Sequence, residues 1–181
     1  MSHDKISRRE FLKRTAVGGA AALALATALP GAKGAHAAEG GRILDAHEWQ
    51  TIEAATARIV PTDQDPGAKE AWAVNYVDQQ LAVCYHDARQ LYHDGVKRLD
   101  DQSQKQFGAN FVDLSPEQQD QILEDAEKND SAFFNTLRQH TMEGCFADPE
   151  YGGNKDRIMW KMVGFPGRKL PDGYTNEIAC Q

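Results

Sequence analysis

The chain has 181 residues, of which 20 are basic and 27 are acidic, and its formal net charge is −7. This balance argues against nucleic acid as a partner, because phosphate contacts need clustered Lys and Arg side chains. It disfavours an anionic membrane surface for the same reason.

The N-terminal stretch "SRREFLK" (residues 7–13) matches every position of the twin-arginine export signal. The basic residues around it are typical of the first region of a signal peptide. The motif predicts export to the periplasm by the twin-arginine translocase, a route that moves folded cargo. The residues that carry the signal are Arg8, Arg9, Phe11 and Leu12.

An uncharged run of 15 residues follows these arginines. It is too short and too weakly apolar to be a good membrane span. Ala35 and Ala37 form a small-x-small cleavage site. We therefore expect residues 1–37 to be a cleaved signal peptide and residues 38–181 to be the mature domain. An uncleaved amphipathic anchor is the alternative.

Removal of the leader leaves 144 residues with 14 basic and 25 acidic side chains, a net charge of −11. This length corresponds to one domain of ordinary size, which can bury a core. The negative charge favours solubility, and it would also help to steer a positively charged partner.

The mature part contains three cysteines, Cys84, Cys145 and Cys180. The periplasm permits disulfides, and an odd number leaves one thiol over or makes one bond to another chain. Cys180 follows a turn-rich tail, so it is the candidate for an intermolecular or tail-tethering disulfide. A buried, unpaired Cys84 or Cys145 would behave as a small apolar side chain.

The first predicted helix of the mature part covers residues 44–60. Asp45 is its predicted N-cap, with Glu48 three residues later as the capping-box partner. Pro61 ends the helix and opens the loop "PTDQDPG". Apolar side chains recur at steps of three and four, which indicates one buried face. That face holds Trp49, Ile52, Thr56 and Ile59.

Residues 68–84 and 85–103 continue the helical period, either as one bent helix or as two. Gly95 weakens the second stretch without ending it. The inward faces of the two stretches are Ala73, Val77, Leu81 and Cys84, and then Tyr85, Ala88, Tyr92, Val96 and Leu99.

The clearest helix start lies at Ser115, which precedes Pro116 at the first helical position and Gln118 as the capping-box partner. A further helix is predicted over residues 131–148, and a short one over residues 158–162. The inward faces of the two longer helices are Ile122, Leu123 and Ala126, and then Phe133, Leu137, His140 and Gly144.

No alternating strand pattern reaches convincing length. The sequence therefore predicts an all-α fold, a single small helical bundle domain with a long irregular C-terminal loop region.

The sequence carries no cofactor motif. It has neither the G-x-G-x-x-G turn of a nucleotide-binding domain nor the C-x-x-C-H of a c-type haem, and three cysteines are too few for an iron–sulfur cluster. His86 and His93 are about 10 Å apart along a helix, too far for one ion. His140, at the edge of an apolar stripe, is more typical of a hydrogen-bonded core histidine than of a metal ligand beside Glu143 and Cys145. We therefore predict no catalytic, cofactor-binding or metal-binding residue.

The most unusual local stretch is "DPEYGGNKDR", residues 148–157. Gly152 and Gly153 permit positive φ, and Asn154 is placed to cap a following helix. Three interpretations remain open here: a loop that only turns and caps, an anion site at exposed amides, and a rigid loop that docks on a partner.

Several segments together resemble the small subunit of membrane-bound gluconate 2-dehydrogenase, the subunit 3 or gamma family. The resemblance covers about residues 44–167, and its most specific parts are "IVPTD…PGA" and "G-x-x-x-DPEYGGN". The two motifs at this spacing, behind a twin-arginine leader, are a specific combination.

The resemblance implies a place in a multi-subunit periplasmic dehydrogenase. In such complexes a large flavoprotein of the glucose–methanol–choline type holds FAD and oxidises a sugar or sugar acid, and a membrane-bound multihaem cytochrome c passes the electrons on. The small subunit would carry the export signal for the folded flavoprotein and would be non-catalytic. The alternatives are a subunit that contributes directly to catalysis or electron transfer, and a solitary periplasmic binding protein.

The two motif segments are hypothesised to contact the flavoprotein, because they are loop-like and rich in turn residues. Tyr151 and Trp160 are the expected aromatic anchors. The full set of predicted interface residues is Pro61, Asp63, Pro66, Gly67, Asp148, Pro149, Tyr151, Gly152, Gly153, Asn154 and Trp160.

Overall fold

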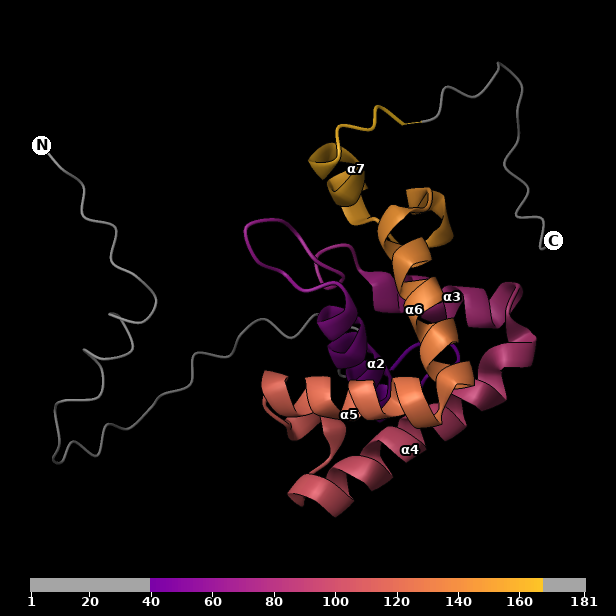
Figure 1. The fold of residues 1–181 in the computed structure, drawn as a ribbon. Coiled ribbons are helices and arrows are strands. Elements are labelled where there is room, and N and C mark those ends of the chain that lie inside the picture. The colour runs from indigo at the N-terminus through magenta and orange to yellow at the C-terminus, as the bar shows by residue number, and fades with distance from the viewer. Residues whose placement is uncertain (1–39, 168–181) are drawn as a thin grey trace, which may run out of the picture. The chain divides into compact units, whose positions relative to one another are not determined.

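The computed structural model describes residues 40–167, all of which belong to one compact unit of the chain (Figure 1). The predicted export signal, its cleavage site and Cys180 lie outside the described residues. The end of the predicted irregular C-terminal region, from residue 168, lies outside them as well.

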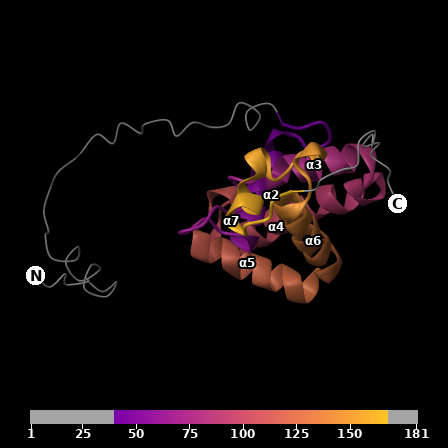
Figure 2. The same ribbon diagram turned by 90° about the horizontal axis from the view of Figure 1, so that it is seen from above.

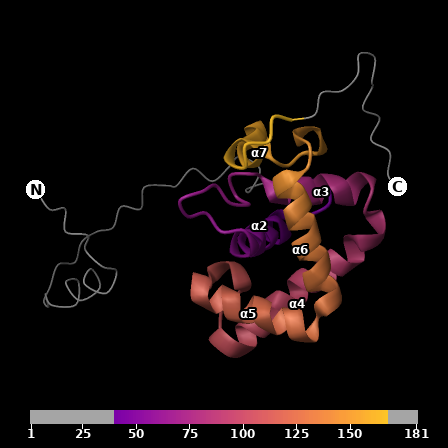
Figure 3. The same ribbon diagram turned by 45° about the horizontal axis from the view of Figure 1, so that its top comes forward.

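The described residues form helices and contain no strand, which confirms the all-α prediction. In Figures 1 and 3, α4 and α5 lie at one end, α7 lies at the other, and α6 runs between them. The α-helices are α2 (Ala46–Ile59), α3 (Ala73–Val83), α4 (Arg89–Phe107), α5 (Pro116–Asn129), α6 (Ser131–Phe146) and α7 (Ile158–Met162). The 3-10 turns are η2 (His86–Ala88), η3 (Phe111–Asp113), η4 (Pro149–Tyr151) and η5 (Lys155–Arg157).

Both predicted capping boxes are present. The Asp45 side chain accepts hydrogen bonds from the backbone N–H groups of His47 and Glu48, and the Glu48 side chain accepts from the N–H of Asp45. Ser115 and Gln118 make the same reciprocal pair at the start of α5. These boxes satisfy N–H groups that have no partner inside the helix, so α2 and α5 begin where the sequence predicts.

Most of the predicted inward-facing apolar side chains form one main core between α2, α3, α4, α5 and α6, whereas Ala73 belongs to a second, smaller cluster. Gly95 lies inside α4, and a Cβ atom added there would come within 2.3 Å of two carbons of the Phe133 ring. The glycine therefore lets α6 approach α4 closely, which explains its presence inside a helix. Trp49 is buried in this core. The largest side chains that the core buries completely are Tyr92, Phe111, Phe133, Leu44, Ile52, Leu81, Ile122 and Leu137.

One predicted boundary was wrong, and one open alternative is settled. Residues 68–72 form a turn instead of the first turn of α3, because Trp72 adopts a left-handed backbone conformation (φ 62°) that a right-handed helix cannot include. Of the two alternatives for residues 68–103, one bent helix or two helices, the structure has two, since α3 ends at Val83 and the short turn η2 separates it from α4. Figure 2 shows α3 and α4 as distinct elements.

No helix among residues 40–167 is long and apolar enough to span a bilayer.

Asp78 of α3 holds the segment that leads into α2. Its side chain is 2% exposed. One carboxylate oxygen accepts from Arg42 N at 2.7 Å, and the other accepts from Ile43 N and Leu44 N, each at 2.9 Å. Three backbone donors thus surround a buried carboxylate and compensate for its lost hydration.

A polar network around His140 joins α3, α4 and α6. His140 is 4% exposed, its Nδ1 lies 3.0 Å from the Tyr92 hydroxyl, and its ring stacks on that of Tyr85 with centroids 4.3 Å apart. Glu143 Oε2 accepts from the hydroxyls of Tyr76 at 2.9 Å and Tyr85 at 3.1 Å. His140 is therefore a hydrogen-bonded core histidine, as the sequence suggested.

Burial lowers the pKa of His140 below its usual 6.5, against the opposing effect of the Glu143 carboxylate. Burial and the same carboxylate raise the pKa of Tyr76 and of Tyr92. The tyrosine hydroxyls consequently keep their protons at neutral pH.

The first prediction concerns Asp78. Replacement by Ala should lower the free energy of unfolding by ~2–4 kcal/mol, because three N–H groups lose a charged acceptor. The control is Asp101→Ala, since the Asp101 side chain is 68% exposed. That change should stay within ~0.5 kcal/mol. Equal effects of the two substitutions in urea unfolding would contradict the role given to Asp78.

The second prediction concerns pH. The lowered pKa of His140 means that the unfolded chain binds more protons than the folded chain below the usual value of 6.5, so stability should fall as pH falls through that value. His140→Gln should flatten this fall, measured as the urea midpoint from about pH 8 to about pH 5.

His47 supplies a control of opposite sign. Its hydrogen bond to Asp100 raises its pKa, so its contribution is complete below 6.5 and is lost as pH rises through the raised value. His47→Gln should therefore steepen the fall at low pH. A steeper curve for His140→Gln as well would refute the assignment.

Candidate functional site

The two motif segments of the sequence come together in the structure around a small second apolar cluster. Its buried members are Ala68, Ala71, Ala73, Cys145 and Met159. Val60, near the start of the first motif, and Ile158, which follows the second motif, pack against it. We call residues 61–67 and 148–160 the motif surface, because they flank this cluster and contain all of the predicted interface residues.

The first motif is a tight loop closed by Gly67 and Glu70. A Cβ atom added at Gly67 would lie 2.6 Å from Thr62 N and from Val60 O. The Gly67 N–H donates to Glu70 Oε2 at 2.9 Å, and the Thr62 hydroxyl donates to the same oxygen. The Thr62 bond, with smaller help from Gly67, lowers the pKa of Glu70. Only glycine fits at this crossing of the loop.

The second motif sits on a close approach of α3 and α6. A Cβ atom added at Gly144 would lie 3.0 Å from the Cα of Ala73, and one added at Gly153 would lie 2.1 Å from Gly144 O. Three backbone segments therefore stack at van der Waals distance, and side chains at either glycine would separate them.

Asn154 fixes the second motif through hydrogen bonds in four directions. It is fully buried, and its N–H donates to Gly144 O at 2.7 Å. Its side-chain amide donates to Ala147 O at 3.1 Å and accepts from Met159 N at 3.0 Å. Its carbonyl accepts from Arg157 N at 2.8 Å. Asn154 thus joins the end of α6 to the start of α7.

One of the three interpretations of this stretch was an anion site at exposed amides near Asn154. The structure uses these amides internally, since Lys155 N donates to Ala71 O at 3.1 Å and Arg157 and Met159 donate to Asn154. Asn154 is the N-cap residue of η5, but its side chain makes no capping hydrogen bond to η5. Of the three interpretations of this stretch, the anion site has the least support, because these three amides are already paired.

Side chains of α3 also hold the loop of the second motif, at Tyr151 and Gly152. Asn75 Nδ2 donates to Gly152 O at 2.6 Å, and Gln80 Nε2 donates to Tyr151 O at 3.3 Å. These partners are more than 70 residues apart in sequence. Nothing in the local sequence around α3 indicated them.

Backbone strain is concentrated in the same region. Among residues 40–167, the non-glycine residues with positive φ are Trp72, Asn154, Asp156 and Arg157. Each left-handed residue of this kind costs about 1–2 kcal/mol. Lys155 Nζ lies 4.8 Å from the centre of the Trp72 ring, so a cation–π contact links two of the strained turns.

The predicted interface residues divide by exposure. Pro61 and Asp63 are exposed. Four are buried, namely Gly67, Gly153, Asn154 and Trp160, and the remaining five are intermediate. The Trp160 indole N–H donates to Phe146 O at 2.7 Å. The buried members can influence a partner only through the loops that they hold, and the interface role of the whole set stays a prediction.

The described cysteines have different states. Cys145 is a buried free thiol in the small apolar cluster, and burial raises its pKa to about 12. It therefore stays protonated and unreactive at neutral pH, as expected of an unpaired structural cysteine. Cys84 is disulfide-bonded.

The other candidate ligands are scattered. His86 contacts the carbonyl of Val83, and His93 contacts Glu48. In the part of the chain that the structure describes, no group of three or more His, Cys, Asp or Glu side chains could hold a metal ion.

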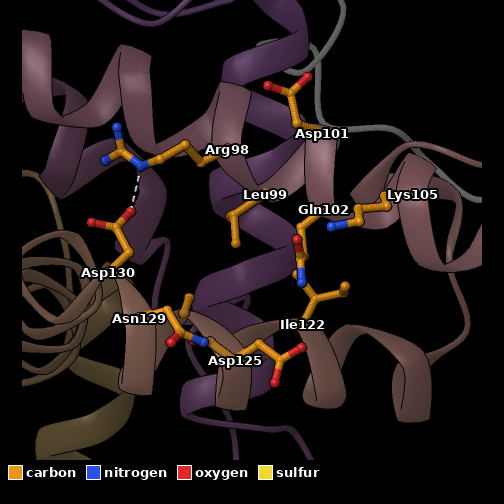
Figure 4. A pocket seen from close by; sticks show the side chains of 10 residues that line it. Arg98, Leu99, Asp101, Gln102, Lys105, Ile122, Asp125, Asn129 and Asp130 are labelled. Carbon is orange, nitrogen blue, oxygen red and sulfur yellow. Dashed lines mark hydrogen bonds and ion pairs between the residues drawn. The ribbon is translucent and has the colours of Figure 1, made fainter.

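A groove of about 400 Å³ lies between α4 and α5 (Figure 4). Its floor is apolar, from Leu99, Ile122 and Ala126, and its walls carry charges of both signs. Arg98 Nε donates to Asp130 Oδ2 at 2.6 Å. None of the lining side chains is Ser, Thr, Cys or His, so the groove offers no nucleophile with a histidine base.

A protein-family model described as gluconate 2-dehydrogenase subunit 3 matches residues 46–167. The match covers α2 to α7 and both motifs of the motif surface. No curated protein and no solved structure matches the chain.

The third prediction concerns Asn154. Asn154→Ala should lower the free energy of unfolding by ~2–4 kcal/mol, because Ala147 O and Met159 N lose buried partners. It should also speed tryptic cleavage at Lys155 and Arg157. The control Asn135→Ala changes an exposed side chain of α6. Unchanged stability and unchanged cleavage in Asn154→Ala would contradict the anchoring role.

Proposed function

Since the chain belongs to the gluconate 2-dehydrogenase subunit 3 family, we propose that it is the small subunit that exports and stabilises a flavin-dependent dehydrogenase. Family membership supports a place as a subunit of a gluconate 2-dehydrogenase complex. The finer role rests on the leader, the "SRREFLK" stretch that contains Arg8 and Arg9.

In this proposal the cofactors belong to partner subunits. A large subunit of the glucose–methanol–choline type would hold FAD and oxidise a sugar or sugar acid, and a membrane-bound multihaem cytochrome c would receive the electrons. The small subunit would be non-catalytic. This division of labour is consistent with a sequence that has neither a G-x-G-x-x-G turn nor a C-x-x-C-H motif.

The proposed order of events follows from the transport route. The large subunit would fold and bind FAD in the cytoplasm, and the small subunit would bind it there before export. The twin-arginine leader would then carry both chains to the periplasm as a folded pair. A pre-formed surface suits this task, and the motif surface is held by many internal hydrogen bonds.

The fourth prediction tests this order. Changing Arg8 and Arg9 together to Lys should leave the large flavoprotein in the cytoplasm, because the leader would act for both chains. The measurement is the flavin absorbance and the size of the proteins that co-purify with the tagged chain from periplasm and from cytoplasm. Arg14→Lys, just outside the motif, is the matched control and should export normally.

Two results would overturn the proposal. One is a flavoprotein that reaches the periplasm although both arginines of the signal are replaced. The other is a wild-type chain that purifies from the periplasm alone and colourless. Substrate turnover by the purified small subunit would instead favour a direct role in catalysis.

A further inference from the structure

A compact exposed apolar feature follows the motif surface. Within residues 40–167, the exposed large apolar side chains are Val83, Met142, Met162, Val163 and Phe165. Three of them lie within four consecutive positions, Met162, Val163 and Phe165, and are 36%, 57% and 44% exposed. We call these three residues the apolar tip. Clustered exposed apolar side chains indicate an interaction site, whereas isolated ones are ordinary.

The apolar tip is fixed in place although it is exposed. Phe165 N donates to Trp160 O at 2.8 Å, and the two rings meet edge to face with centroids 4.9 Å apart. Val163 N donates to Met159 O at 3.1 Å. Trp160 is itself anchored to α6 through Phe146 O. A partner would therefore meet an aromatic side chain that is already ordered, which reduces the entropic cost of binding.

The surroundings of the tip are basic. Lys155, Arg157 and Lys161 are exposed. Asp156 is the only acidic residue in the sequence from position 151 to position 167. The whole chain has a net charge of −7. A local excess of positive charge on an acidic protein favours partners with negative charge at the matching place.

We propose that the apolar tip is the contact through which this chain binds its large subunit, at an apolar groove on that subunit rimmed by carboxylates. This inference rests on the proposed function, because it takes the large subunit as the partner. Phe165 would fill the groove, and Lys161 and Arg157 would face its acidic rim. An ordered aromatic side chain beside basic residues is the composition that dominates binding energy in protein interfaces.

The test compares two substitutions at equally exposed positions. Phe165→Asp places a charge in the tip, and Met142→Asp places one on α6, where the side chain is also 44% exposed. Each tagged, full-length chain is purified with its co-purifying flavoprotein, and affinity is measured by titration. Phe165→Asp should weaken binding at least ~30-fold, whereas Met142→Asp should change it less than ~3-fold.

A second variant tests the charge. Lys161→Glu should weaken binding and also reduce its dependence on salt concentration, because one attractive pair becomes repulsive. Circular dichroism and urea unfolding of every variant show whether the fold is retained. If Phe165→Asp unfolds the tip, Val163→Asp replaces it, since Val163 is the most exposed of the three residues.

The outcomes separate this inference from the function on which it rests. A wild-type chain without a flavoprotein partner refutes the proposed function. If the wild-type chain has that partner, and the Phe165→Asp and Val163→Asp variants bind it with full affinity, only the role given to the apolar tip is refuted. Co-sedimentation of the wild-type chain with phosphatidylglycerol vesicles, or self-association lost in Phe165→Asp, would give the tip a different occupant and overturn the inference.

Discussion

The close approach of α3 and α6 at Ala73 and Gly144 is the constraint on which the rest of the candidate site depends. Because Gly144 has no side chain, α6 comes against the start of α3, and Gly153 can then lie against the carbonyl of Gly144. Asn154 reaches its buried position only after this stacking. The segment that leads to α7 is therefore set by how two helices pack, and not by its own sequence preferences.

Hydrogen bonds offset the backbone strain near this contact. Four non-glycine residues in the turns around it have positive φ. Asn75 and Gln80 of α3 donate to the adjoining loop at Gly152 and Tyr151. The side chain of Asn154 donates to Ala147 O and accepts from Met159 N. Strained conformations persist where the surroundings over-determine them. An ordered surface at one end of the described helices is the result, and such a surface can bind a partner without first reorganising.

This geometry changes how the family motifs are interpreted. The second motif is distinctive in sequence, yet Gly153 and Asn154 are buried and serve the fold. Accessible residues lie in its first half, where Glu150 is exposed, in the loop that begins at Pro61 and in the apolar tip. A distinctive motif can thus serve mainly to hold a surface in place, and in our proposal the contacts to the partner come from the neighbouring apolar tip.

The sequence by itself determined the helices and their caps. The capping boxes at Asp45 and Ser115, the buried faces and the short helix at 158–162 depend on residues three or four positions apart, so their signals are local. Only the tertiary structure decided the turn at Trp72, the clamp at Asp78, the room made by Gly95 and Gly144, and the anchoring of the second motif. The hydrogen bonds involved join residues far apart in sequence: Leu44 and Asp78 are 34 positions apart, and Asn75 and Gly152 are 77 positions apart. Their energy arises only when the helices pack, and a local pattern cannot contain it.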